Sequence, residues 1–308
     1  MECPATEQKE IQTGAVRNHF RNRRTAPARG PVPVSFLRLP AVRSFRSKAA
    51  RRCRPFSEQQ LSEPALVLAP HPDDETLAAG GIIAEKRARG VPVTIVFVTD
   101  GARSHTRCGP GLLSRIRKNE AEAACNALGV GADYIHFLDI PEGRIPAYGK
   151  RLEEFLARFV NFEEVSQIFL PYRADGHPDH ESTFRCALAG LGRFNARFDL
   201  YEYPVWAYNI WPFVGLEIAP NRSTFKALLE SFKALFGLKL LGRCNTVFRL
   251  GPRLVQKEKA LECYASQMKR PPGEPDWPVL ADVAEGDFLE LLLAPFELFK
   301  KTRFHAGP

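Results

Sequence analysis

Short, continuously apolar segments alternate with helix patterns along the middle of this chain. Such runs, bounded by turn residues and rich in β-branched side chains, are typical of strands buried on both faces of a parallel sheet. The expected strands cover residues 65–70, 93–99, 134–138 and 167–170, and the expected helices cover 76–89, 114–128, 151–162 and 181–191. Four strand–helix units in succession predict an α/β fold, a Rossmann-like three-layer α/β/α arrangement with a mostly parallel sheet. Ligands of such sheets bind at the carboxyl ends of the strands.

The pattern becomes less regular after residue 203. We expect a fifth strand at 198–203, another at 246–250, a core helix at 252–267 and a C-terminal amphipathic helix at 287–300. An amphipathic helix is also predicted over 223–241. It either packs on the core as a lid over the site, or lies with its apolar face against a membrane. We expect residues 61–308 to form a single domain.

Positive charge is concentrated at the start of the chain. Residues 1–60 hold thirteen Lys/Arg and four acidic residues, a net charge of +9, whereas the remaining 248 hold thirty against thirty-one, a net of −1. The acid-poor, proline-rich composition predicts a disordered leader, because it offers little apolar surface to bury. There are two alternatives. The segment is an upstream translation that is absent from the mature protein, or it is a transit peptide or an arm that binds anionic surfaces. The near-neutral body gives no support to nucleic-acid binding.

The seven cysteines are odd in number and include no CxxC pair. This usage favours a reducing compartment over a disulfide framework or a thiolate zinc site. No run reaches the ~18–20 apolar residues of a membrane span. These features predict a cytoplasmic protein.

Two clusters of titratable residues follow two of the expected strands. Residues 69–75 read APHPDDE after the first strand, and residues 175–180 read DGHPDH after the fourth. A single His-Asp pair at a strand end is most often a helix cap or a satisfied polar pair. Two such clusters at the same edge of one sheet predict the two halves of a metal site.

The residue types in these clusters suit metal-assisted hydrolysis. A catalytic zinc takes three His or carboxylate ligands and keeps one position open. The clusters offer three histidines (71, 177, 180) and three aspartates (73, 74, 179), more than ligation needs. The surplus supplies what hydrolysis requires, a general base for the attacking water and an acid for the leaving group.

At these residues the chain resembles the LmbE-like (PIG-L) family of zinc-dependent N-deacetylases. Residues 71–75 stand for the family's H-P-D-D-E motif and residues 177–180 for its H-P-D-H motif. Supporting similarity lies at residues 80–81, 99–101, 117–120, 128–129 and 259–267, so the resemblance covers about residues 64–270. Where some members carry a tyrosine before the second motif, this chain has Asp175-Gly176.

The resemblance implies a role for each matching residue. His71, Asp74 and His180 match the ligands of Zn²⁺, with Fe²⁺ as the alternative metal. Asp73 matches the general base, His177 the group that stabilises the oxyanion and protonates the departing amine, and Asp179 the carboxylate that orients His177. Arg117 matches an arginine used on substrate. Glu75 is interpreted either as a residue that supports the ligands from behind or as a negative charge at the start of the helix.

The resemblance thus implies a hydrolase that removes acetyl from an N-acetylated amino sugar or small glycoconjugate. Two alternatives stay open, a zinc amidohydrolase for another acyl-amine and a metal-binding domain without turnover. Arg103 and His105 lie in the loop after the second strand, where they meet substrate or solvent. The aromatic residues Trp206, Tyr208 and Trp211 either stack on a sugar ring or pack in the core. Contact with a membrane surface stays an open interpretation, and the sequence indicates no oligomeric state.

Overall fold

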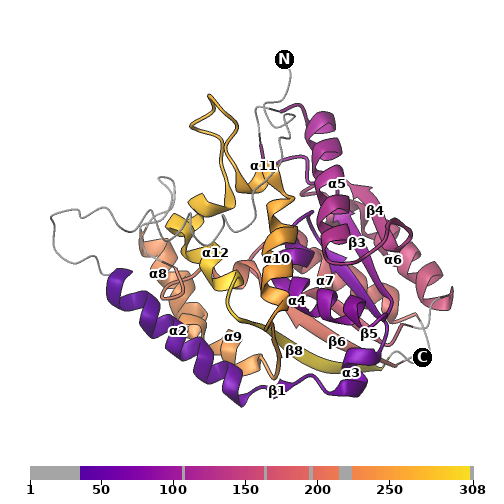
Figure 1. Cartoon of the computed structure of the whole chain (residues 1–308), viewed down its shortest axis with the longest axis horizontal. Coiled ribbons are helices and arrows are strands. Elements are labelled where there is room, and N and C mark those ends of the chain that lie inside the picture. Colours follow the sequence, from indigo (N-terminus) through magenta and orange to yellow (C-terminus); the bar gives the residue numbers. More distant parts are fainter. Residues whose placement is uncertain (1–34, 106–107, 163–164, 194–196, 215–223, 306–308) are drawn as a thin grey trace.

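A computed structural model describes residues 35–105, 108–162, 165–193, 197–214 and 224–305 (Figure 1). Within these residues, eight strands form one sheet in the order β1-β7-β8-β6-β5-β2-β3-β4. The strands are β1 Arg54–Pro55, β2 Ala65–Ala69, β3 Val93–Thr99, β4 Ile135–Ile140, β5 Gln167–Pro171, β6 Arg197–Tyr203, β7 Thr246–Arg249 and β8 Phe296–His305. Strand β8 runs antiparallel to both β6 and β7, and the other pairs are parallel. The predicted α/β fold with a mostly parallel sheet is confirmed.

The strand order places a switch point beside β2. The chain passes from β2 outward to β3 and β4, and then returns to add β5 on the other side of β2. Loops at the carboxyl ends of β2 and β5 therefore leave the sheet next to each other, where α/β proteins bind their ligands. The two titratable clusters follow these two strands.

Alternate residues of the central strands contribute to two hydrophobic clusters, one on each face of the sheet. Val67 and Ala69 of β2 join the cluster that includes α4 (Asp74–Ala88), α5 (Pro110–Ala127) and α10 (Arg253–Glu262). Leu66 and Leu68 join the cluster that includes α6 (Ile145–Phe162) and α7 (Pro178–Leu191). This alternation produces the predicted three layers.

Several predicted boundaries shift at the ends of helices. Helix α5 begins at Pro110 instead of 114, because Gly109 caps it and proline is suited to the first helical turn. Helix α6 begins at Ile145 instead of 151. The predicted helix over 252–267 divides into α10 and the short α11 (Ala265–Met268).

The prediction of a disordered leader is wrong for residues 35–60. Helix α2 (Ser35–Arg52) is followed by β1 and by α3 (Glu58–Ser62), and β1 pairs with β7. Leu39 and Val42 of α2 are buried, and the guanidinium carbon of buried Arg46 lies 4.6 Å from the Tyr208 ring centroid. Apolar residues at helical spacing between the arginines supply the contact surface that the composition concealed. Residues 1–34 lie outside the described part of the chain.

Two other helix predictions are wrong in part. The helix expected over 223–241 is broken into α8 (Thr224–Lys233), η4 (Leu235–Gly237) and α9 (Leu238–Arg243), since Phe236 and Gly237 have φ angles of 52° and 81°. Residue 223 lies outside the described residues. The C-terminal helix expected over 287–300 stops early, because α12 (Asp287–Leu292) ends before Pro295 and β8 follows. No helix among the described residues has the length and apolarity needed to cross a membrane.

Candidate metal centre

A strained turn carries the first cluster from β2 into α4. His71 and Asp73 lie in this turn, and Asp74 begins the helix. Asp73 has a φ angle of 125°, a region that side chains other than glycine rarely occupy and that costs about 1–3 kcal/mol. The amide of Asp73 donates to Glu75 Oε2 at 3.2 Å, and Tyr264 donates to Glu75 Oε1 at 2.6 Å. Contacts from a distant segment therefore support this turn.

Asp74 brings the two clusters together. Its Oδ2 lies 3.2 Å from His71 Nδ1 and 3.1 Å from His180 Nε2. All three side chains are buried, and His180 is fully inaccessible to solvent. The structure thus brings the three predicted metal ligands to one point at the carboxyl ends of β2 and β5.

Asp175 orients His180 from behind. Its Oδ2 lies 2.8 Å from His180 Nδ1, and its carboxylate also accepts hydrogen bonds from the amides of Val205, Trp206 and Ala207. A carboxylate on the far nitrogen of an imidazole fixes the ring and directs the other nitrogen toward a ligand position. This role was not predicted, although Asp175 stands only two residues before the second motif.

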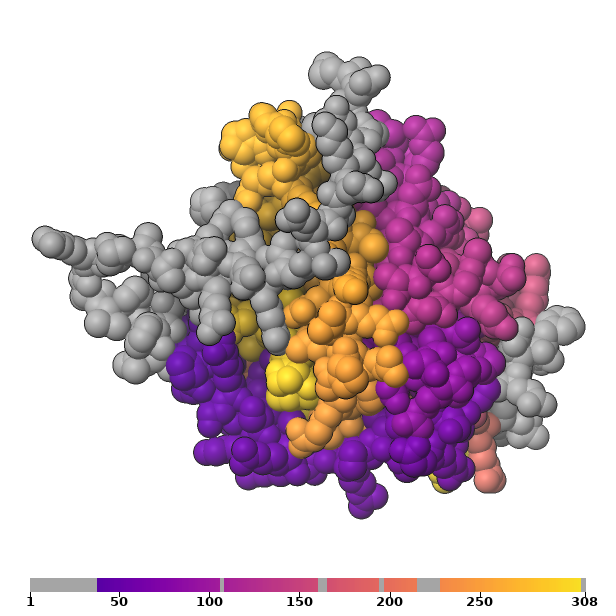
Figure 2. Space-filling view, viewed as in Figure 1, coloured from indigo at the N-terminus to yellow at the C-terminus, as the bar shows by residue number. Residues whose placement is uncertain are grey.

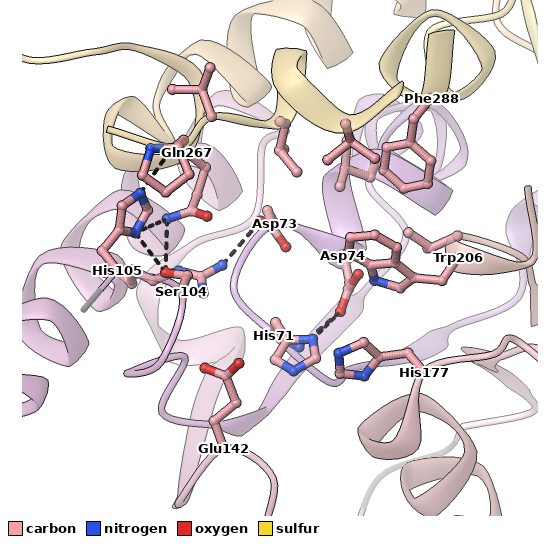
Figure 3. Close-up of a pocket in the computed structure, with 17 residues that line it drawn as sticks. His71, Asp73, Asp74, Ser104, His105, Glu142, His177, Trp206, Gln267 and Phe288 are labelled. Atoms are coloured by element: carbon pink, nitrogen blue, oxygen red, sulfur yellow. Dashed lines mark hydrogen bonds and ion pairs between the residues drawn. The ribbon is translucent and has the colours of Figure 1, made fainter. Parts of the chain in front are cut away.

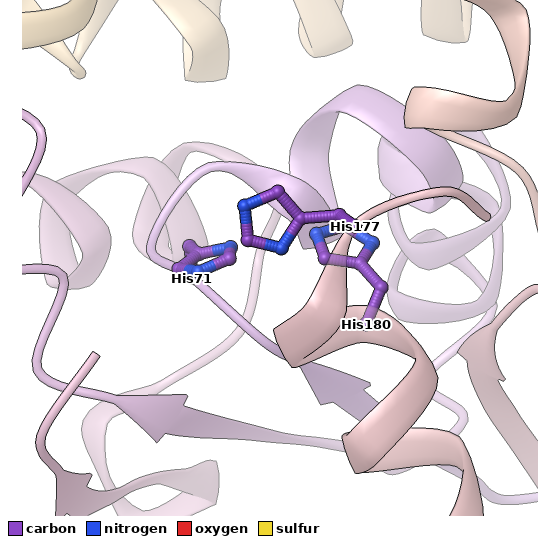
Figure 4. Close-up of side chains that lie close together, drawn as sticks. All are labelled: His71, His177 and His180. Atoms are coloured by element: carbon purple, nitrogen blue, oxygen red, sulfur yellow. The ribbon is translucent and has the colours of Figure 1, made fainter. Parts of the chain in front are cut away.

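His177 is the third imidazole of the site. It caps the start of α7, where its Nδ1 accepts from the Asp179 amide at 3.3 Å, and its side chain is only partly buried. Ring nitrogens of His71, His177 and His180 lie within 4.8 Å of one another (Figure 4). Two sets of metal ligands are therefore possible, and both contain His71 and His180. The third ligand is Asp74 in one set and His177 in the other.

The polar atoms of this cluster fit a divalent cation. Among the described residues, neither ring nitrogen of buried His180 makes a well-aligned hydrogen bond, despite the short distances to Asp74 and Asp175. An imidazole so placed has ligand capacity left over. Two imidazoles and a carboxylate are also the donor types that zinc and iron accept.

The electrostatics agree with a cation at this point. Burial lowers the pKa of His71, but the hydrogen bonds to Asp179 and Asp74 outweigh it and raise the pKa to about 9. Burial opposes ionisation of Asp74 too, yet the neighbouring charges of His180 and His71 and the hydrogen bond to His71 lower its pKa. The carboxylates around the rings therefore favour positive charge here, which a metal ion supplies when the imidazoles are neutral.

Asp73 occupies a different environment from Asp74. Burial raises the pKa of Asp73 to about 8, although the Arg117 guanidinium opposes the shift. Arg117 donates to Asp73 Oδ2 at 3.0 Å, to the Gly101 carbonyl at 3.1 Å and to the Pro72 carbonyl. The predicted substrate arginine is thus buried and braces the predicted base, and it also lines the cavity.

Asp179 contacts a different histidine from the one expected. Its Oδ2 lies 3.2 Å from His71 Nε2 and accepts from the Gly143 amide at 2.9 Å. The structure thus places the Asp179 carboxylate against His71, and not against His177 as predicted. Burial and the neighbouring charges of His71 and His180 lower the pKa of His177 to about 4, so a neutral ring is favoured there.

A cavity of about 260 Å³ opens over these residues (Figure 3). Trp206 and Phe288 lie on the side of Asp74 and His177, and their rings stack with centroids 4.9 Å apart. Ser104, His105 and Gln267 form the opposite wall. The site therefore offers an apolar wall and a hydrogen-bonding wall on either side of Asp73.

The remaining predicted binding residues are divided between the cavity and its rim. His105 lines the cavity, stacked on Trp277 at 4.1 Å between centroids and bonded to the Pro278 carbonyl at 3.0 Å. Arg103 is exposed and donates its amide to Glu142 Oε2, but it does not line the cavity. Trp206 lines the cavity, whereas Tyr208 is buried in the core. Glu142 also lines it and was missed, because no motif marks it.

Fold and site together define an α/β protein with a candidate metal centre at the switch point of its sheet. Residues 66–190 match the family described as GlcNAc-PI de-N-acetylase (PIG-L). The predicted resemblance is confirmed over these residues, which make up less than half of the chain.

Curated relatives carry related names. The chain is 26% identical over 140 residues to the probable N-acetyl-alpha-D-glucosaminyl L-malate deacetylase 2 of Bacillus subtilis, a match that spans 43% of this chain and 62% of the relative. It is 31% identical over 148 residues to the diacetylchitobiose deacetylase of Thermococcus kodakarensis, spanning 44% and 53%. The chain thus spans less than two thirds of the length of these relatives.

A solved structure extends the likeness of fold beyond the family domain. The N,N'-diacetylchitobiose deacetylase of Pyrococcus horikoshii superposes with a TM-score of 0.53 at 19% identity, covering 89% of this chain and 95% of that one. The arrangement of helices and strands is therefore shared over most of the described chain.

Proposed function

We propose that the protein is a zinc-dependent hydrolase that removes the N-acetyl group from an N-acetylated amino sugar or glycoconjugate. The observation that carries the proposal is the meeting of His71, Asp74 and His180 beside a separately braced Asp73 at one end of a cavity. The two relatives above are both named as deacetylases of N-acetylated sugars, and these names support the same reaction.

The residues of the chain divide the work of amide hydrolysis. His71, Asp74 and His180 would hold the cation, which polarises the amide carbonyl and makes water acidic when it is bound. Asp73 lines the cavity and takes the proton from the attacking water. His177, at the partly exposed edge of the site, would stabilise the oxyanion through a ring N–H and, in its protonated form, would protonate the departing amine. Fe²⁺ is the alternative metal, because it accepts the same donors.

A second candidate substrate class is favoured by the apolar wall. Leu77, Val205, Trp206 and Phe288 line the cavity next to the candidate metal ligands, where a bulky acyl group or an apolar aglycone would bury its surface. A zinc amidohydrolase for a non-sugar acyl-amine would use the same catalytic groups.

The test is release of acetate from a panel of N-acetylglucosamine conjugates and simple N-acyl-amines by the zinc-loaded protein. We expect the protein to release acetate from the sugar conjugates. Chelator treatment should abolish this release, and added zinc should restore it. Turnover of the acyl-amines alone would favour the second class. Stoichiometric metal with no turnover of any amide would leave only the non-catalytic interpretation.

A further inference from the structure

Exposed apolar side chains gather on one short stretch of the chain. Among the described residues, eight large hydrophobic side chains are exposed, and five of them lie between residues 228 and 238. These five, which we name the α8–α9 apolar face, are Leu228, Leu229, Phe232, Leu235 and Leu238, with exposed fractions of 39–63%. Single exposed apolar residues are ordinary on a protein surface, but a contiguous group marks an interaction site.

The face is presented by helices that are anchored from below. Leu240 and Leu241 of α9 are buried in the main core, whereas Leu238 is 53% exposed. Ser231 of α8 is buried and its Oγ accepts from the Trp211 amide at 3.0 Å. Helices α8 and α9 are therefore folded onto the body while their outer side chains face solvent.

Helix α2 adds positive charge beside this face. Helices α2, α8 and α9 lie along the same side of the molecule in Figure 1, and α2 contacts α9. Helix α2 contains six Arg/Lys and no acidic residue, but Arg38 and Arg43 pair with Asp287 and Glu290 and Arg46 is buried. Residues 224–243 contain four Arg/Lys and one glutamate. Lys48, Arg51, Arg52, Lys233 and Lys239 are exposed. In the space-filling view, the indigo surface of α2 lies at the lower left edge of the molecule (Figure 2).

We propose that the α8–α9 apolar face and α2 together dock the protein on an anionic lipid surface. Apolar side chains next to a dense group of Lys and Arg have the chemistry of an interfacial helix, in which apolar residues enter the headgroup region and basic residues contact acidic lipids. A second copy of the chain fits less well, because it would bring the same positive helices into the contact. The charge is local, since residues 61–308 carry a net charge of −1.

The docking helices are connected to the cavity wall. Arg38 of α2 donates to the carbonyls of Pro212 and Phe213 and pairs with Asp287, the neighbour of Phe288. The segment from Trp206 to Trp211 joins the apolar wall of the cavity to α8. The docking helices and the apolar wall of the cavity therefore belong to one connected set of contacts.

The experiment is flotation of the full chain with phosphatidylcholine vesicles that contain or lack phosphatidylserine. We expect binding only with phosphatidylserine. Phe232→Glu and Leu238→Glu should each lower the partition coefficient about 10-fold or more, as expected for losing a buried large apolar side chain. Each of Lys48→Glu, Arg51→Glu and Lys239→Glu should lower it about fivefold.

The matched control is Val255→Glu on α10, because Val255 is equally exposed, at 57%, but lies outside the face. It should bind as the wild type does. The basic residues 1–34 are present in every variant and cannot account for a difference between them. Three results would overturn the proposal: no vesicle binding by the wild type, equal binding by Phe232→Glu and Val255→Glu, or a dimer in sedimentation equilibrium that Phe232→Glu dissociates.

Discussion

The strand ends that carry the candidate metal centre and the C-terminal part of the chain use buried polar groups in opposite ways. At the centre, His180 is buried with ring nitrogens that lack aligned hydrogen bonds among the described residues. In the C-terminal part, the buried Lys257 ammonium meets Glu297 at 2.8 Å, and Glu297 also accepts from the amides of Gly81 and Ile82. At the centre, the His180 ring nitrogens can therefore still bind a metal. In the C-terminal part, the buried Lys257 and Glu297 are paired within the protein.

The internal pairs of the C-terminal part converge on the helices that begin at the site. Glu297 holds the middle of α4, and Tyr264 holds Glu75 in the first turn of the same helix. Ser266 donates its amide and hydroxyl to Glu120 of α5, the helix that carries Arg117. Substitutions at the centre should therefore change metal binding and chemistry, and those in the C-terminal part should change stability first.

The largest expected effect is loss of the metal. Asp74→Ala and His180→Ala each remove a side chain from the meeting point of the two clusters. Zinc content by mass spectrometry should fall from about one ion per chain to near none. Metal affinity should fall by more than ~10–100-fold, which is the usual loss when a residue that only hydrogen-bonds to a metal ligand is substituted.

His177→Ala is the matched variant for this prediction. It should retain zinc and lose activity if His71, Asp74 and His180 are the ligands. Loss of zinc from His177→Ala together with its retention by Asp74→Ala would show that the three imidazoles hold the metal. Thermal melts of the apo forms should differ little.

The next effect concerns Asp73. Asp73→Asn keeps the shape of the side chain and one acceptor for Arg117, but it removes the group that takes a proton. Acetamide hydrolysis should fall by ~10²–10⁴-fold with zinc content unchanged. Activity equal to that of the wild type, measured on the same metal-loaded preparation, would remove Asp73 from the mechanism.

The sequence predicted the site where the fold itself brings motifs together. His71, Asp74 and His180 converge because β2 and β5 are neighbours and the two motifs lie in the connections that follow these strands. The sequence could not reveal partners outside the motifs or the directions of side chains within them. Glu142 comes from the loop after β4, and the direction of the Asp179 carboxylate toward His71 depends on side-chain rotation.

The predictions failed where tertiary contacts override a local pattern. Residues 296–300 read as part of an amphipathic helix, but they belong to β8, which pairs with β6 and β7 as a strand between the two. The basic composition of α2 also led to a wrong prediction of disorder, because Arg46 is buried against Tyr208 and donates to the Leu291 carbonyl at 2.8 Å. Long basic side chains can pack their apolar stems in a core, which composition alone does not show.

Glu297→Gln tests the C-terminal side of the comparison. It leaves the fully buried Lys257 without a counter-charge, and breaking a buried pair by removing one partner costs about 3–5 kcal/mol. The free energy of unfolding in urea should fall by this amount, with zinc content per folded chain retained. Lys257→Met in the same background should restore part of the loss.

Asp282→Asn serves as the surface control for this substitution, because Arg270 and Asp282 form an ion pair that is partly exposed. It should change the free energy of unfolding by about 0–1 kcal/mol. Equal effects of Glu297→Gln and Asp282→Asn would contradict the view that the C-terminal part stabilises α4 through buried polar pairs.

The smallest effect, and the one that joins the two regions, is expected from Tyr264→Phe. The substitution removes only the hydroxyl that donates to Glu75, whose other oxygen accepts from the strained Asp73 amide. Losing one partner of a buried acceptor should lower the free energy of unfolding by about 1–3 kcal/mol. Tyr148→Phe, at a side chain that is 45% exposed, should change the free energy of unfolding by less than about 0.5 kcal/mol.

If Glu75 transmits the C-terminal support to the turn, kcat of Tyr264→Phe should fall while KM and zinc content stay unchanged. A loss of stability with an unchanged kcat would instead confine the role of Tyr264 to folding.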